Sequence, residues 1–172
     1  MDFTKLDISL KELSLDSAFL IDCKFDKLDL SKTDFYRGWL CSSTFREATM
    51  DYCSFVKADL RYADFSHVVL AYANFLSSEC WETVFFGSHL EYANLTDTLC
   101  IRTDFRKANL MQADIKMSLF DHVLLQGANL AGMKGIEEAD IESINLGTVE
   151  EPIMLEGEQA KYWMLEQANL HS

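Results

Sequence analysis

The sequence predicts an all-β solenoid in which the backbone coils and each side of the coil is one pentad of residues. Three observations predict it: an apolar residue at every fifth position, a small residue two positions earlier, and Asp or Asn at many of the positions between. The apolar series runs without a polar residue from Leu10 to Leu130, which is 25 positions. An α-helix would advance by about 500° over five residues, and in a flat strand every fifth residue changes face. The apolar residues are therefore buried together only if the chain turns a corner once per pentad.

Four sides per coil fit the order of the apolar residues best. Phenylalanine alternates with Leu, Met or Cys between residues 25 and 85, so an even number of sides stacks like on like, whereas three sides would stack Phe on Leu. With four sides, residues 20 apart lie over one another. The predicted core then contains two phenylalanine columns on opposite walls: Phe25, Phe45, Phe65, Phe85 and Phe105, and Phe35, Phe55 and Phe75.

Several pentads carry a recognisable motif. Ala58-Asp59-Leu60, Ala63-Asp64-Phe65 and Ala128-Asn129-Leu130 resemble the A-(D/N)-L-x-x motif of the pentapeptide-repeat family, and the resemblance covers about residues 8–146. It implies a right-handed quadrilateral parallel β-helix with about six to seven coils spaced by about 4.8 Å. The Asp and Asn residues are interpreted as turn residues that bind nearby backbone N–H groups.

The chain is expected to form a single domain, residues 1–172, with one irregularity and one cap. A one-residue register break is expected at 131–136, where Gly132 and Gly135 permit a local bulge. The break is interpreted as a tolerated insertion or as a binding bulge. Residues 147–172 are predicted to form a partly helical C-terminal cap.

Residues 158–169 of the cap are compatible with a helix. Ala160, Trp163, Met164 and Gln167 would share one face, with Trp163 as the anchor. A tail without a defined helix is the alternative. The pattern leaves open whether the segment covers the end of the coil or an apolar wall.

Composition and charge exclude several classes of function. The net charge of −13 argues against general binding to nucleic acid or to an anionic membrane surface. No apolar run approaches the roughly 18 residues of a membrane span, and the N-terminus does not look like a signal peptide.

Five cysteines, an odd number, favour reduced thiols, so a cytoplasmic location is expected. Cys23, Cys53, Cys80 and Cys100 are predicted to point inward and Cys41 outward.

No catalytic, metal-binding or cofactor-binding site is predicted. His67, His89, His122 and His171 lack ligand neighbours at metal spacing, and no nucleophile, phosphate-loop or dinucleotide motif is found. The sequence therefore favours a protein that is not an enzyme.

One wall is expected to be apolar on its outer face. Its inward residues are Leu20, Leu40, Leu60, Cys80, Cys100 and Phe120. The outward residues beside them include Phe19, Ile21, Trp39, Trp81, Leu99, Ile101 and Leu119. We expect a protein contact there, either with another protein or with a second copy. Coverage by the cap and plain exposure are the alternatives. A Tyr52–Tyr72–Tyr92 column is expected at another corner.

Two functions follow. The favoured one is a protein-interaction or structural module whose partner the sequence does not identify. The alternative comes from the family resemblance, since some members protect or inhibit DNA gyrase by imitating duplex DNA. An acidic rod is compatible with that role, but basic residues such as Lys24, Arg61 and Arg102 lie along the shaft and no loop interrupts the pentads.

Overall fold

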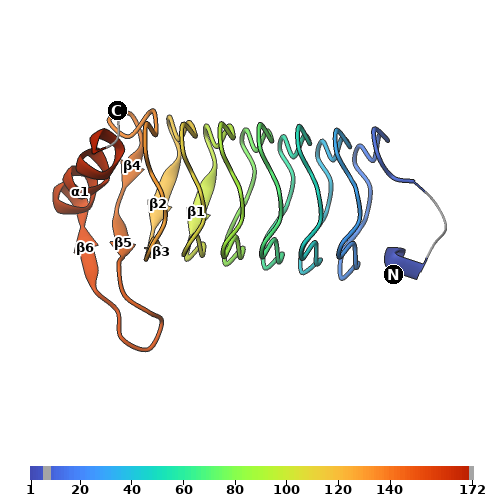
Figure 1. Cartoon of the computed structure of the whole chain (residues 1–172), viewed down its shortest axis with the longest axis horizontal. Coiled ribbons are helices and arrows are strands. Elements are labelled where there is room, and N and C mark those ends of the chain that lie inside the picture. The colour runs from blue at the N-terminus through green and yellow to red at the C-terminus, as the bar shows by residue number, and fades with distance from the viewer. Residues whose placement is uncertain (6–8, 171–172) are drawn as a thin grey trace.

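The computed structural model describes residues 1–5 and 9–170, which form a solenoid of stacked coils (Figure 1). Residue 8, where the repeat was expected to start, lies outside this described part. So do residues 171 and 172 of the cap, the first of which is His171. A short 3₁₀ helix, η1 (Phe3–Lys5), lies at the N-terminal end. At the other end follow, in chain order, β1 (Leu99–Ile101), β2 (Leu119–Asp121), β3 (Val123–Leu124), β4 (Asp140–Ile141), β5 (Ser143–Asn145), β6 (Met154–Glu156) and the helix α1 (Gly157–Asn169).

The coils are held together by parallel backbone pairing between residues 20 apart. Trp39 pairs with Asp59 and Asp59 with Glu79, and β1 and β2 continue the same ladder. Between these ladders the chain turns once per pentad. The turn residues, every fifth residue from Glu12 to His122, have positive φ angles, and among them only Gly87 is a glycine. Twenty residues per coil and five per corner make the solenoid four-sided, as predicted.

Each corner is a tight turn that opposes the preference of ordinary residues. At Tyr62 φ is 62°, a left-handed conformation that disfavours side chains. The Ala63 N–H donates to the Leu60 carbonyl at 3.0 Å across this turn. At the next corner the Asp64 carboxylate accepts from the Ser66 N–H at 2.9 Å, which confirms the predicted role of the repeat's acidic residues. The pairing between coils and the buried core must offset the strain at every corner.

The core consists of the two predicted phenylalanine columns. In one, Phe45 and Phe65 stack with ring centroids 4.7 Å apart, and in the other Phe55 and Phe75 stack at 4.9 Å. Rings of the two columns meet edge to face, as Phe55 and Phe65 do at 5.5 Å. All eight phenylalanines of these columns are fully buried. The same geometry extends through the column that begins at Phe25 as far as Phe105.

The first five residues close the N-terminal end of one column. Asp2 pairs in parallel with Lys24, and the Phe3 ring stacks on Phe25 at 4.5 Å. The repeat pattern did not predict this contact, because Phe3 lies 22 rather than 20 residues before Phe25. Phe3 therefore takes the place that a repeat phenylalanine would occupy one coil below.

The predicted register break is confirmed. Asp114 pairs with Lys134, 20 residues later, whereas Leu119 pairs with Asp140, 21 residues later. The extra residue widens the turn after Gly135, whose carbonyl accepts from the Ala139 N–H at 3.0 Å. A Cβ atom at Gly135 would lie 2.4 Å from the Lys116 nitrogen, so the glycine permits this close approach.

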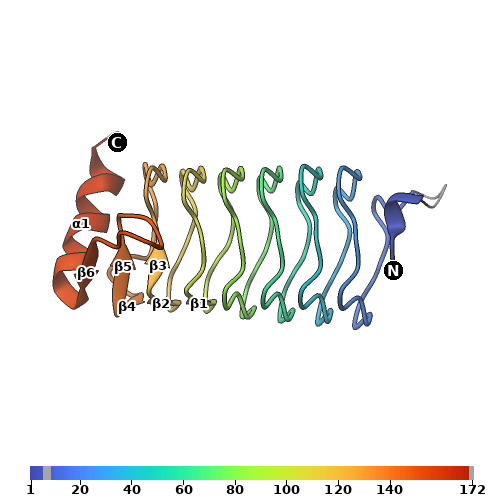
Figure 2. The same ribbon diagram turned by 90° about the horizontal axis from the view of Figure 1, so that it is seen from below.

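The C-terminal segment covers the end of the last coil (Figures 1 and 2). The sequence did not predict β6, which pairs antiparallel with β5. The helix α1 contacts β4, β5 and β6. The expected helix forms. Ala160, Met164 and Ala168 are its buried residues, while Trp163, the expected anchor, is half-buried and packs against the same core. Small side chains at 160 and 168 let the helix approach the coil, and Met164 fills the space between them. The cap therefore does not fold over the apolar wall.

Truncation of one stacked phenylalanine should destabilise the whole solenoid. We expect Phe65→Ala to lower the free energy of unfolding by about 3–5 kcal/mol, since it opens a cavity in a dry core. Tyr62→Ala, which removes an exposed ring from the same coil, should change it by less than about 0.5 kcal/mol. Chemical denaturation measures both values, and equal losses for the two variants would show that the column does not carry the stability.

The stability of the solenoid at the register break should depend on Gly135. Gly135→Ala places a methyl group against the backbone of Lys116, so we expect a loss of stability at least twice that of Gly127→Ala. Gly127 has a similar φ angle of 70°, but a Cβ atom added there would lie 3.6 Å from its nearest neighbour, Lys107 Cγ. The strain at Gly127 alone should cost roughly 1 kcal/mol. Thermal unfolding of both variants provides the comparison, and an equal loss would mean that the bulge relaxes freely.

Candidate interaction surface

The predicted apolar side of the solenoid is called the tryptophan wall, after Trp39 and Trp81 on its outer face. Backbone pairing aligns one outer column along this wall from Phe19 to Leu119, and a second column runs parallel to it. The first contains Phe19, Trp39, Asp59, Glu79, Leu99 and Leu119, and the second contains Ile21, Cys41, Arg61, Trp81, Ile101 and Asp121.

Most of the predicted contact residues are exposed. The exposed fraction is 77% for Phe19, 45% for Trp39 and 39% for Trp81, and Ile21 and Leu99 are also exposed. Ile101 and Leu119 are only half-buried. Phe19 and Trp39 stack with ring centroids 5.6 Å apart, so they present one continuous aromatic surface.

Charged residues divide the wall into two apolar patches. Arg61 donates two hydrogen bonds to the Asp59 carboxylate, from Nε at 2.8 Å and from Nη2 at 2.7 Å, and Glu79 lies 3.6 Å from the same guanidinium. The N-terminal patch consists of Phe19, Ile21 and Trp39. The C-terminal patch consists of Trp81, Leu99, Ile101 and Leu119. The sequence pattern suggested one strip, because it counted apolar residues without their order along the wall.

A groove of about 490 Å³ runs along the corner beside Trp39. The corner residues Ser17, Arg37, Lys57 and Ser77 line it. Arg37 lies over the Tyr36 ring at 5.1 Å. Within residues 1–5 and 9–170, neither Arg37 nor Lys57 has a carboxylate within ion-pair distance.

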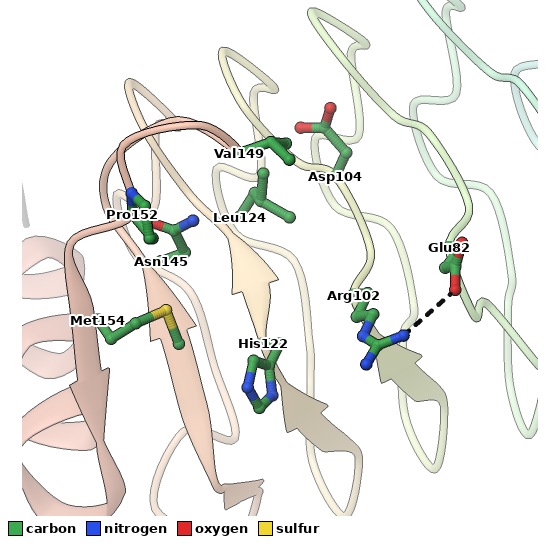
Figure 3. Close-up of a pocket in the computed structure, with 9 residues that line it drawn as sticks. All are labelled: Glu82, Arg102, Asp104, His122, Leu124, Asn145, Val149, Pro152 and Met154. Atoms are coloured by element: carbon green, nitrogen blue, oxygen red, sulfur yellow. Dashed lines mark ion pairs between the residues drawn. The ribbon is translucent and has the colours of Figure 1, made fainter.

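A second groove, of about 570 Å³, lies at the other edge of the wall, under the loop that joins β5 to β6 (Figure 3). Leu124, Val149, Pro152 and Met154 supply its apolar lining. The Glu82–Arg102 ion pair, 3.6 Å long, borders it at one end (Figure 3). The repeat pattern did not predict this groove, since it depends on a loop outside the repeat.

His122 at the border of this groove belongs to a cluster that resembles a catalytic triad in composition only. Asp121 Oδ1 lies 2.6 Å and Ser143 Oγ 3.2 Å from the same ring nitrogen, Nδ1 of His122. The Ser143 hydroxyl donates to Asp121 at 2.8 Å and accepts from the His122 backbone N–H at 2.8 Å. A catalytic relay needs the nucleophile and the orienting acid on opposite ring nitrogens of the histidine base. The arrangement therefore fixes a corner rather than activating a nucleophile.

The other walls carry mostly polar or paired side chains. The wall that contains Leu70 presents Asp29, Thr49, His89 and Asn109 at the positions equivalent to Trp39. The predicted tyrosine column is confirmed: Tyr72 stacks on Tyr52 at 5.0 Å and on Tyr92 at 4.9 Å.

Burial makes four of the five thiols inert. Desolvation raises the pKa of Cys53 and of Cys80 to about 12, and it raises the pKa of Cys100 well above the usual range. Cys23 is also buried, whereas Cys41 on the tryptophan wall is half-buried, and all five thiols are free. This distribution agrees with the predicted orientations.

The part of the chain that the structure describes contains no group of three His, Cys, Asp or Glu side chains that could hold a metal ion. No helix in the same residues is long and apolar enough to cross a membrane.

The comparisons with known proteins concern the repeat. The family described as pentapeptide repeats matches in eight copies over residues 40–75, 63–99 and 88–127. No curated protein sequence matches the chain.

Three solved structures illustrate the likeness. A trypsin-treated form of QnrB1, a plasmid-mediated fluoroquinolone resistance protein, is 18% identical with a TM-score of 0.49, over 81% of this chain and 80% of that chain. HetL, involved in heterocyst differentiation regulation in the cyanobacterium Nostoc sp. strain PCC 7120, is 18% identical with a TM-score of 0.35, over 81% and 87%. A pentapeptide-repeat protein from the Arabidopsis thaliana thylakoid lumen is 22% identical with a TM-score of 0.34, over 63% and 65%.

One thiol should react in the folded protein. We expect a colorimetric thiol reagent at neutral pH to modify Cys41 quickly and the other four cysteines only after unfolding, because a buried neutral thiol is a poor nucleophile. Cys41→Ser should abolish the fast reaction. Two or more fast thiols in the native protein would contradict the assigned inward positions.

Proposed function

This chain belongs to the pentapeptide-repeat family, and from that premise we propose that it acts without catalysis, as a module that binds another protein through the tryptophan wall. The observation that carries the proposal is the exposure of Phe19, Trp39 and Trp81 on one side of a rod whose core is already complete. Large exposed apolar patches mark interaction surfaces in soluble proteins, and tryptophans are frequent anchors of such contacts.

The fold itself does not require these side chains. The repeat determines the inward residues Leu40 and Cys80, which are fully buried, but the outward neighbours Trp39 and Trp81 contribute nothing to the phenylalanine columns. On the wall that contains Leu70 the equivalent position of each coil is mainly polar. An aromatic surface that folding does not need is best explained by binding.

Imitation of DNA at a topoisomerase has less support from the charge arrangement. A duplex presents rows of unpaired anions, whereas many carboxylates along this shaft are paired with Lys or Arg. The pairs include Lys11–Asp29, Arg46–Asp64, Arg61–Asp59, Arg102–Glu82 and Arg106–Asp104. Residues 131–172 carry a net charge of −7, whereas residues 10–130, which form most of the rod, carry only −5.

Removal of both tryptophans should abolish binding and leave the fold intact. We expect the Trp39→Ala/Trp81→Ala variant to keep its unfolding temperature within a few degrees and to lose the partners that the native chain captures from a native lysate. Tyr52→Ala/Tyr92→Ala, which removes two exposed rings from another corner, is the matched control and should retain them.

Two outcomes would contradict the proposal. An unfolded tryptophan variant would mean that these side chains belong to the core. Unchanged capture by the variant, together with inhibition or protection of DNA gyrase in a supercoiling assay by the native chain, would favour the DNA-imitation role instead.

A further inference from the structure

We infer that the partner of the tryptophan wall is a second copy of this chain, lying antiparallel and face to face with the first. The inference rests on the proposed function and names the partner of the same surface. For this purpose, each pentad of the wall is a rung, numbered by its inward residue from rung 20 to rung 120.

The order of the rungs is symmetric about the middle of the wall. Rungs 20 and 40 form the N-terminal patch, rungs 100 and 120 carry most of the C-terminal patch, and Asp59, Arg61 and Glu79 lie between them. Asp121 is the charged outer residue of rung 120. A two-fold axis that lies between the two walls, parallel to the strands and midway between the levels of Leu60 and Cys80, lays rung 20 on rung 120 and rung 40 on rung 100. Phe19 then meets Leu119 of the second copy, and Trp39 meets Leu99. Such a self-complementary patch is what a two-fold interface requires.

The charged centre of the wall lies against its own rotated copy. Rung 60 meets rung 80, so Arg61 lies opposite Trp81 of the second copy. The two hydrogen bonds to Asp59 lie in the plane of the guanidinium and leave its faces free to stack on an indole. The same rotation sets Asp59 opposite Glu79 of the second copy. The Arg61 guanidinium of each chain, which contacts both carboxylates of its own chain, offsets this approach of like charges.

The two corners that border the wall supply further complementarity. At the corner beside Trp39, Arg37 meets Asp97 of the second copy, and Lys57 meets Ser77. Asp97 accepts from the Ser77 hydroxyl at 2.7 Å, and no Lys or Arg among the described residues pairs with it. At the opposite corner the rotation brings together Asp22 and His122, Ser42 and Arg102, and Tyr62 and Glu82, none of which is a pair of like charges.

The parallel arrangement is less favourable. It would pair Asp59 with Arg61 of the second copy, but it would set Asp140 and Glu142, the exposed residues of the next rung, opposite each other in the two chains. Residues 131–172 carry nine acids and two bases and would lie side by side in the two chains. The antiparallel arrangement places these acidic segments at opposite ends of the dimer, so it minimises their repulsion.

The size of the wall predicts a reversible dimer. Six rungs span about 24 Å and three extended residues about 10 Å. This footprint is well below the roughly 800 Å² per partner of a standard stable interface. We therefore expect an equilibrium between monomer and dimer that shifts toward the dimer with protein concentration. It should also shift toward the dimer with salt, which screens the net charge of −13 on each chain.

Sedimentation velocity of the full chain over the micromolar range tests the inference. The native chain should show concentration-dependent dimers, and Trp39→Ala/Trp81→Ala should remain monomeric. Arg37→Glu and Asp97→Arg should each weaken the dimer by about tenfold, since a two-fold interface contains each contact twice. The Arg37→Glu/Asp97→Arg double variant should regain most of the loss. The two residues lie three rungs apart in one chain, so only a contact between chains explains rescue.

Cross-linking tests the orientation. In the antiparallel dimer Cys41 faces Ile101 of the second copy, while the two Cys41 residues are about 14 Å apart along the rod. A short bis-maleimide should therefore join Ile101→Cys chains and leave native chains unjoined, with Cys41→Ser/Ile101→Cys as the control. Efficient joining of native chains through Cys41 would overturn the antiparallel arrangement.

The remaining outcomes separate this inference from the proposed function. A native chain that stays monomeric at every concentration and salt overturns the inference, while loss of capture by the tryptophan variant would still support binding of a different protein. Dimers that persist in the tryptophan variant, or a charge-swapped double variant without rescue, would also overturn it.

Discussion

Stacking of inward side chains at the spacing of the backbone ladders is the constraint on which the structure depends. Coils joined by parallel pairing place equivalent residues about 4.8 Å apart, and the rings of Phe45 and Phe65 stack at 4.7 Å. The planar side chains therefore fill the interior without a gap between rungs. The tight turns at the corners contain left-handed residues such as Tyr62, and the buried columns offset that strain. The exposed ends of the interior must also be covered by apolar side chains. Phe3 covers Phe25 at one end, and Met164 covers the last coil at the other.

The interior and the corners could be predicted from the sequence because each residue there serves the same repeated environment. The period of five places Phe55, Cys80 and their equivalents inward, and Gly132 and Gly135 mark the bulge at 131–136. Features outside the repeat could not be predicted in this way. Phe3 lies out of register, and β6 depends on pairing with β5 rather than on a local pattern. The helix itself was predictable. The sequence did not show whether its buried face would be Ala160, Met164 and Ala168 or a face centred on Trp163, because that depends on the surface of the last coil.

The outer faces of the walls are freer than the core, because the repeat specifies only the inward residues. A count of apolar side chains found the tryptophan wall, but it did not find the Asp59–Arg61 pair that divides it. That pair appears only when the residues are placed in order along the rod. The same ordering places Arg37 and Asp97 at equal distances from the middle of the wall, and it concentrates unpaired acidic charge in the C-terminal segment. Stability and recognition thus reside in separate sets of residues on each pentad.

Native-state hydrogen exchange tests most directly whether the stacked columns carry the stability. The amides of Phe45, Phe65 and Phe85 donate to carbonyls of the next coil, and we expect them to exchange only through unfolding of the whole solenoid. They should therefore share one free energy of opening, equal to that from chemical denaturation. Faster and unequal exchange among these amides, with coils opening independently of one another, would contradict the account.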